Sequence, residues 1–563
     1  MPLKKSDEQA TELKEKLIEA ALQAEERSAK LSAEKSGHEY ANLSVISPQT
    51  QALELITEEE ARSAFCAPFM LKGKAINFAC KDLGLDATRR IIARLESQGY
   101  QLKIFVVSLQ SLKYAWAGYQ LIEASKKKEI TGKIDIEAST LEDIGKKVTN
   151  ISQIKKEIEE FKSPYASQIF ELILAGALAL DASDVHIEAE EGAARLRYRL
   201  DGALQDVTDL PLNYYRSLLS RIKLLSGMKI NIHSAAQDGR FTIKTKEVDI
   251  EIRVSIIPSA YGETVVMRIL NPKTIQLKLE DLGFREDDLM IIAEEIKRPN
   301  GIILNTGPTG SGKTTTLYAF LRRIYRPEIK IITIEDPIEY HLEGISQTQV
   351  NPGRNYTFAN GLRSILRQDP DVILIGEIRD NETAEIAMHA ALTGHLVFST
   401  LHTNEAAGTI PRLLDMKVQA AILAPALNLS IAQRLVRKLC VFCRKKVKLT
   451  PEETKKIQEI IAKLPERVKK PKLGDEIEIF EAGVGCEKCN STGYKGRIAV
   501  LELFLVDPEI QEMINQPQLP TIIKLKELAV KKGMVRMEED AILKILAGLT
   551  SISEAETVLG RII

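Results

Sequence analysis

The sequence contains a glycine-rich run that ends in lysine and threonine, a combination suited to binding phosphate groups. Its members are Gly307, Pro308, Thr309, Gly310, Ser311, Gly312, Lys313 and Thr314, with Thr315 directly after. The spacing is that of a Walker A loop, and the run lies between an apolar stretch and a helix-prone one. Its glycines let backbone N–H groups point at phosphates, Lys313 reaches the β- and γ-phosphates, and the Thr314 hydroxyl is a ligand for Mg²⁺. The run therefore predicts binding of ATP and Mg²⁺.

A carboxylate follows a second apolar run, Val372 to Ile375. After it come Gly376 and Glu377, so an acid is expected at the tip of a buried strand, as in a Walker B motif. Gly376 stands where many such ATPases have an aspartate associated with magnesium. Glu377 is therefore the residue predicted to orient or deprotonate the attacking water.

Two further apolar runs are flanked by polar residues. The run ending at Ile334 is followed by Glu335, which is predicted to support the metal shell, because parallel strands bring their carboxyl ends to one edge of a sheet. The other run, at residues 396–398, is preceded by His395 and followed by His402. Taken alone, these histidines would be interpreted as structural; beside the other motifs, they are predicted to relay the state of the γ-phosphate.

Four of the six cysteines form two Cys-x₂-Cys pairs, Cys440 with Cys443 and Cys486 with Cys489. Four thiolates suit a closed tetrahedral Zn²⁺ site, which is structural because it has no open position for water. The pattern predicts a zinc-binding region at residues 437–492; free core cysteines are the alternative. The other two cysteines lack metal-ligand spacing and are expected in a core.

The elements that must position these residues are short apolar strands separated by helices, which predicts an α/β fold with a parallel sheet covered on both faces. Five segments are predicted: a charged helix or disordered segment at 1–40, a small α/β module at 41–124, a charged linker at 125–162, an α/β domain at 163–275 and the ATPase domain at 276–563.

Bulk composition restricts the partners. The 563 residues carry a formal net charge of -1 and 5% aromatic residues, which argues against a nucleic-acid partner. We find neither a signal peptide nor an apolar stretch long enough to span a membrane. The sequence therefore predicts a cytoplasmic protein in a reducing compartment.

Together these motifs resemble those of the ATPases that drive type IV pilus assembly and type II secretion. Besides the Walker A run, the resemblance rests on residues 334–339 (the family's Asp box), 376–380 (Walker B) and 394–404 (His box). Residues 182–188, 197–202 and 237–240 resemble the family's second N-terminal domain, which is PAS-like. The resemblance fades before about residue 60.

The resemblance implies a RecA-like ATPase domain that works in a hexameric ring at the inner membrane. It implies that arginines of the PAS-like domain approach the phosphates, and the candidates are Arg240, Arg253 and Arg268. It also implies a cytoplasmic adaptor and an inner-membrane platform protein as partners. The N-terminal module and the four cysteines are typical of pilus-extension and secretion motors, whereas retraction motors lack both.

Three other functions stay open at this point. A type II secretion motor would have the same chemistry and different partners. A nucleic-acid translocase would need a basic strip or an aromatic platform, and a scaffold that binds nucleotide without turnover would not need the intact Lys313, Thr314 and Glu377. We predict a pilus-assembly ATPase as the main function.

Overall fold

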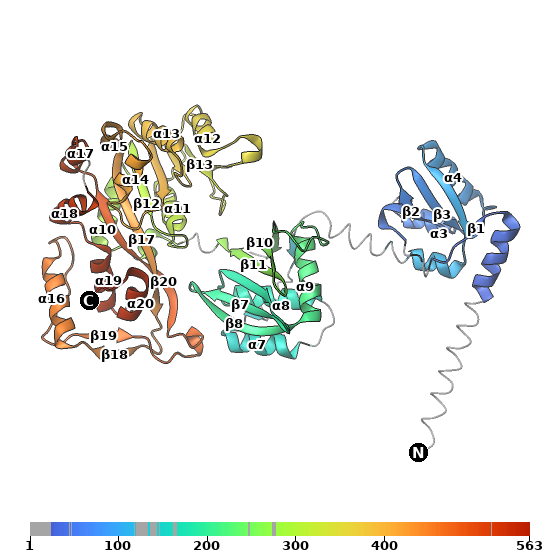
Figure 1. Cartoon of the computed structure of the whole chain (residues 1–563), viewed down its shortest axis with the longest axis horizontal. Helices are drawn as coiled ribbons and strands as arrows, with labels where there is room; N and C mark the ends of the chain where they lie inside the picture. The colour runs from blue at the N-terminus through green and yellow to red at the C-terminus, as the bar shows by residue number, and fades with distance from the viewer. Residues whose placement is uncertain are drawn as a thin grey trace, which may run out of the picture. The chain divides into compact units, whose positions relative to one another are not determined.

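The protein is described from a computed structural model (Figure 1). It describes residues 24–43, 46, 48–53, 55–116, 119, 133–135, 144–145, 147–161, 166–245, 248–272, 277–518 and 521–563. The chain divides into two compact units, residues 1–132 and 133–563. In the described part of the chain, no helix is long and apolar enough to cross a bilayer.

The first unit is a small α/β module with a four-stranded sheet in the order β1-β4-β3-β2. Its strands are β1 (Glu39–Tyr40), β2 (Cys66–Lys72), β3 (Ala75–Cys80) and β4 (Gln101–Val106), and its helices include α2 (Thr50–Leu53), α3 (Glu58–Ser63) and α4 (Asp86–Ser97). Residues 24–36 of the segment predicted as a charged helix or disordered segment are helical. Residues 1–23 of that segment lie outside the described residues. Cys66 and Cys80 face each other across β2 and β3 and are buried, as expected of core residues.

The second unit begins with a seven-stranded sheet in the order β5-β9-β10-β11-β6-β7-β8. Its elements are β5 (Lys133–Asp135), α7 (Ile151–Glu160), α8 (Ala166–Ala179), β6 (Asp184–Ala189), β7 (Ala193–Leu200), β8 (Ala203–Pro211), α9 (Leu212–Leu225), β9 (Gln237–Lys244), β10 (Asp249–Ser259) and β11 (Gly262–Leu270). Every second residue of β7 is buried, so one face of this sheet packs on the helices. Two of the elements, β5 and α7, lie in the stretch predicted as a linker.

The second sheet of this unit has the order β14-β13-β15-β16-β12-β17-β20. Its strands are β12 (Gly301–Thr306), β13 (Ile331–Glu335), β14 (Ser346–Gln349), β15 (Val372–Ile375), β16 (Leu396–Leu401), β17 (Leu427–Leu439) and β20 (Tyr494–Leu505). Neighbouring strands from β14 to β17 are parallel, and only β20 runs antiparallel, beside β17. The predicted parallel sheet is confirmed.

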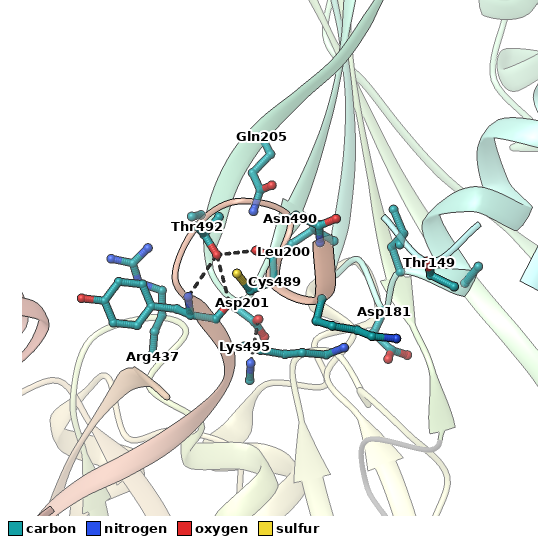
Figure 2. Close-up of a pocket in the computed structure, with 16 residues that line it drawn as sticks. Thr149, Asp181, Leu200, Asp201, Gln205, Arg437, Cys489, Asn490, Thr492 and Lys495 are labelled. Atoms are coloured by element: carbon teal, nitrogen blue, oxygen red, sulfur yellow. Dashed lines mark hydrogen bonds between the residues drawn. The ribbon is translucent and has the colours of Figure 1, made fainter. Parts of the chain in front are cut away.

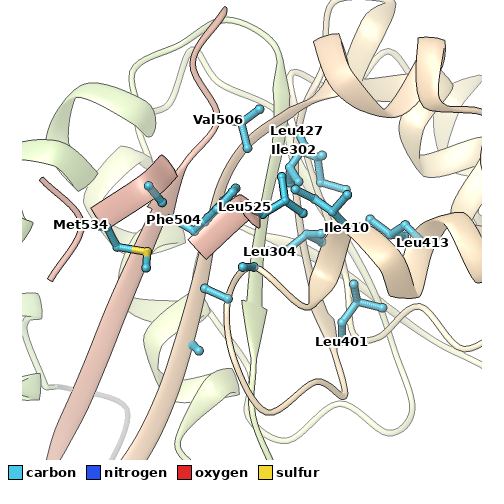
Figure 3. Close-up of a cluster of buried hydrophobic side chains, with 14 of the residues drawn as sticks. Ile302, Leu304, Leu401, Ile410, Leu413, Leu427, Phe504, Val506, Leu525 and Met534 are labelled. Carbon is cyan, nitrogen blue, oxygen red and sulfur yellow. The ribbon is translucent and has the colours of Figure 1, made fainter. Parts of the chain in front are cut away.

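Helices cover both faces of this sheet. They are α10 (Glu286–Glu295), α11 (Lys313–Ile324), α12 (Phe358–Leu366), α13 (Asn381–Leu392), α14 (Thr409–Asp415), α15 (Ala420–Ala426), α17 (Pro508–Ile514), α18 (Ile522–Lys531), α19 (Met537–Leu546) and α20 (Ile552–Leu559). Ile303 packs in a cluster with Phe320 of α11, whereas Ile302 and Leu304 pack with Ile410 of α14 on the other face (Figure 3). Alternate residues of β12 thus pack into two different hydrophobic cores. The polar residues next to this strand can therefore gather only at its ends.

The segment between β17 and β20 carries the cysteines. It contains β18 (Lys445–Lys448), α16 (Pro451–Lys463), β19 (Glu478–Glu481) and the 3₁₀ helix η4 (Glu487–Cys489). β18 and β19 form a two-stranded antiparallel sheet. The two Cys-x₂-Cys pairs flank this two-stranded sheet in the sequence, so the pairing of β18 with β19 brings them together although they are far apart along the chain.

Candidate functional site

The glycine-rich run connects the end of β12 at Thr306 to the start of α11 at Lys313. Gly310 and Gly312 have φ angles of 79° and 87°, the left-handed region that favours glycine. Lys313 Nζ donates to the backbone oxygens of Gly307 and Pro308, at 2.8 and 3.0 Å. The loop thus curls around its own lysine at the N-terminus of a helix, where anions bind.

Residues 309–315 of this loop line a cleft of about 490 Å³. Burial lowers the pKa of Lys313, and the nearby Glu377 carboxylate opposes that shift. The loop offers N–H donors and an ammonium to phosphates. Thr314, Asp336 and Glu377 add oxygen atoms to the lining, and oxygen is the donor that Mg²⁺ prefers. These residues fit a nucleotide with Mg²⁺.

Glu377 directly follows β15, and its side chain is 14% exposed. Its carboxylate forms an ion pair with Arg379 and lies 3.3 Å from His402 Nε2. The hydrogen bond that Arg379 donates to the Glu377 carboxylate raises the pKa of Arg379, which also lies 3.7 Å from Asp336. Residues that follow β13, β15 and β16 are thus brought to one edge of the sheet, beside the loop.

Glu335, the last residue of β13, is 3% exposed and lines the same cleft. Its carboxylate accepts hydrogen bonds from the Tyr318 hydroxyl, from Thr333 Oγ1 at 2.5 Å and from Gln347 Nε2 at 3.1 Å. Burial and the charge of Glu335 raise the pKa of Tyr318. The orientation of Glu335 is therefore set by protein donors.

The two predicted histidines lie at opposite ends of strand β16. His402 comes after β16 and lines the cleft. His395 comes before β16, and its Nδ1 lies 3.0 Å from the Ala390 oxygen. A strand rises about 3.3 Å per residue, so β16 separates the two side chains by roughly 20 Å. The structure therefore does not bring His395 to the cleft, and the predicted role of His395 at the γ-phosphate is not supported.

The three candidate arginines occupy one row across adjacent strands. Arg253 on β10 pairs in register with Arg240 on β9 and with Arg268 on β11. Arg268 lines the cleft and lies 3.1 Å from Asp184. Arg253 donates to Glu339 at 3.0 Å, whereas the Arg240 side chain is 73% exposed. Of the three, only Arg268 is part of the cleft lining.

Several residues in or next to this cleft have no individual role predicted from the sequence. The sequence places Asp336 directly after Glu335 at the carboxyl edge of the sheet, whereas Arg379, two residues after Glu377, is predicted only as part of the Walker B motif. Tyr318 resembles an ordinary apolar position of α11. Gln347 lies on β14, and no sequence signal connected it to Glu335.

The four cysteine sulfurs all lie within 4.8 Å of one another. Sγ of Cys440 lies 3.8 Å from that of Cys486, and Sγ of Cys489 lies 3.7 Å from those of Cys443 and Cys486. A tetrahedral Zn²⁺ site with bonds of about 2.3 Å has S···S edges of about 3.8 Å. The cluster therefore has the size and the donors of a Zn²⁺ site.

The turn after Cys489 is held by hydrogen bonds (Figure 2). The Thr492 hydroxyl donates to the Cys489 oxygen at 2.6 Å and accepts from the Tyr494 N–H at 3.2 Å. Burial acts to raise the pKa of Cys489, but N–H groups of Cys486 and Gly493, at 3.2 and 3.3 Å from Sγ, help to lower it to about 7. Such donors favour the thiolate that binds metal.

Comparisons with known proteins agree with this geometry. Residues 159–557 match the family described as type II/IV secretion system protein. The type IV pilus assembly ATPase PilB of Thermus thermophilus is 37% identical over 560 residues, which are 96% of this chain and 58% of that protein. PilB of Myxococcus xanthus is 36% identical over 522 residues, covering 91% and 87% of the two chains.

Two further similarities cover about seven tenths of the chain. Type II secretion system protein E of Aeromonas hydrophila is 43% identical over 387 residues, which cover 69% of this chain and 74% of the relative. The Legionella pneumophila ATPase DotB is 21% identical with a TM-score of 0.52, over 71% of this chain and 96% of that one. The structural similarity shows the fold alone, an α/β fold of the RecA-like secretion ATPases.

Proposed function

The chain belongs to the type II/IV secretion system protein family, and we propose that, as an ATPase of this family, it powers type IV pilus assembly. The observation that favours pilus assembly is the share of this chain that each relative matches. The two PilB relatives match 96% and 91% of this chain, including most of the first unit, whereas the Aeromonas secretion protein matches 69%. Type II secretion is the second candidate, because identity over the matched region is higher there, at 43%.

We assign the chemistry to residues of the cleft. Backbone N–H groups of residues 309–315 and the Lys313 ammonium hold the phosphates, once Lys313 leaves the carbonyls of its own loop. Mg²⁺, when bound, neutralises phosphate charge, and Thr314 and Glu335 support it. Glu377 accepts a proton from the attacking water. His402, whose Nε2 lies 3.3 Å from the Glu377 carboxylate, responds to the change in charge of that carboxylate.

We further propose that the protein works as a hexameric ring that moves an inner-membrane platform protein and binds a cytoplasmic adaptor. Arg268, at the edge of the cleft, links the first sheet of the second unit to the phosphates. Forming and breaking this contact between Arg268 and the phosphates during turnover would convert ATP hydrolysis into rotation of one domain against the other. The four cysteines hold Zn²⁺ as a structural ion.

The whole proposal is tested with the full chain and with cells. We expect Mg²⁺-dependent ATP turnover and a six-subunit mass in the presence of nucleotide. Deleting the gene should remove surface pili and leave protein secretion unchanged, and the wild-type gene should restore the pili. Loss of secretion with intact pili would assign the protein to the second candidate function.

Replacing Lys313 with alanine is expected to weaken ATP binding about 10- to 100-fold, because a charge-assisted contact to phosphate is lost. The dissociation constant can be measured by titration with a fluorescent ATP analogue. Lys297, an exposed lysine just before β12, provides the control, and Lys297→Ala should bind as the wild type does. Equal affinity in both variants would remove Lys313 from the site.

The arginine row gives a second prediction. Arg268→Ala is expected to lower kcat for ATP by about 10- to 100-fold, because a cation near the transferred phosphoryl group is lost. Arg240 lies in the same row but outside the cleft lining, so Arg240→Ala should change kcat less than about twofold. Steady-state turnover of both variants decides between them. A larger loss of kcat in Arg240→Ala than in Arg268→Ala would place the functional arginine on β9 instead of β11.

A further inference from the structure

A buried glutamine lies directly beside the phosphate-binding loop. Gln433 on β17 follows Ala432, which pairs with Thr306 at the end of β12, and Gln433 is 1% exposed. Its Oε1 accepts hydrogen bonds from Asn305 Nδ2 at 3.0 Å and from Thr316 Oγ1 at 2.9 Å. Asn305 is in β12 and Thr316 is in the first turn of α11. One amide oxygen therefore bridges the two elements that the loop connects.

Gln433 also packs against both ends of the loop. A Cβ added to Gly307 would lie 2.5 Å from the Gln433 backbone oxygen, and a Cβ added to Gly312 would lie 2.9 Å from Gln433 Nε2. Both distances are too short for a side chain. The first and last glycines of the loop therefore rest on the same residue, which fixes the space that the loop can occupy.

We propose that Gln433 is a positioning residue for ATP binding, one that holds the end of β12 and the start of α11 at the separation the loop needs. Its neighbour Leu435 is among the described residues that line the cleft, whereas Gln433 is not, so Gln433 acts through the loop. This inference rests on the proposed function, because it assigns a role within the same cleft. The residues that shape the loop then include one on a third element, β17, besides those of the loop's own sequence motif.

The hydrogen bonds explain why the role requires an amide. Asn305 and Thr316 are both fully buried, so without Oε1 neither donor can turn to water. Buried donors that lose their acceptor destabilise the arrangement that leaves them unpaired. The strand end and the helix start would move to find other acceptors, and the loop between them would lose the geometry in which its N–H groups converge on phosphates.

The test variant is Gln433→Met, which keeps the length of the side chain and removes both polar atoms. We expect the dissociation constant for ATP, measured with the full chain, to rise about tenfold, the effect of unpairing a buried donor. KM for ATP should rise in parallel, with kcat reduced less than KM is raised. An unchanged dissociation constant would overturn the proposal.

The matched control is another buried amide on β17. Asn428 Nδ2 donates to the Asn300 oxygen at 3.0 Å and lies against Gly301, at the opposite end of β12. Asn428→Leu should lower the unfolding temperature about as much as Gln433→Met does, while ATP affinity stays within about twofold of wild type. Equal loss of affinity in both variants would mean that Gln433 supports only general stability, and would overturn the proposal.

Thr316→Val provides a milder change if Gln433→Met does not fold. It removes one donor to Oε1 without altering shape, and we expect a smaller loss of ATP affinity, about threefold. When Gln433→Met folds, adding Thr316→Val to it should cost less affinity than the same change in wild type, because the two residues act through one hydrogen bond. Additive effects, or no effect of Thr316→Val, would contradict the proposal. A wild-type chain that binds no ATP would instead contradict the proposed function.

Discussion

Glu377→Gln is expected to lower the turnover number for ATP by about 100- to 10,000-fold, the usual contribution of a general base. The glutamine keeps the size of the side chain at the end of β15 but cannot accept a proton from water. ATP affinity should stay within about threefold or improve, because one negative charge near the phosphates is removed. Single-turnover measurements with saturating ATP separate the chemical step from binding.

The control for this variant is Glu382→Gln. Glu382 lies in the first turn of α13, its side chain is 58% exposed, and it pairs with Arg363 outside the cleft. The Glu382→Gln variant should hydrolyse ATP at the wild-type rate. The Glu377 variant also removes the negative charge that Arg379 and His402 share, while its amide oxygen can still accept a hydrogen bond. Turnover that remained at the wild-type level in Glu377→Gln would remove Glu377 from the mechanism.

Cys489→Ser is expected to abolish zinc binding and to unfold the region between β17 and β20 locally. Binding of structural Zn²⁺ contributes about 10–16 kcal/mol in small zinc-binding peptides, as much as the whole stability of a typical domain. Elemental analysis should find one zinc per wild-type chain and less than about a tenth of that in the variant. Limited proteolysis should then cut within residues 440–496.

Cys80→Ala is the matched control, because Cys80 is a fully buried cysteine outside the cluster. It should retain its zinc and the protease resistance of residues 440–496. A strong chelator should reproduce the Cys489→Ser cleavage pattern in wild type but leave the first unit unchanged. Carefully purified wild-type protein without zinc would show that the four-thiolate cluster has another role.

Local sequence was sufficient wherever the chemistry is carried by consecutive residues. The loop from Gly307 to Thr314 takes its shape from its own glycines, and the acid of Glu377 follows directly from the end of an apolar strand. The Cys-x₂-Cys pairs predicted a cluster because each pair forms one local turn. The parallel sheet followed from short apolar strands that alternate with helices, since such strands must be covered on both faces.

Only the tertiary structure decided which distant residues meet at these motifs. The strand order β9-β10-β11 places Arg268 of β11 in the lining of the cleft, whereas Arg240, two strands away on β9, is not part of that lining. The direction of β16 separates His395 from His402, a distinction that strand length could have indicated. Pairing of β17 with β12 brings Gln433 to the loop. These choices depend on strand order and register, which are set by the packing of the whole sheet and are not encoded in any short run of residues.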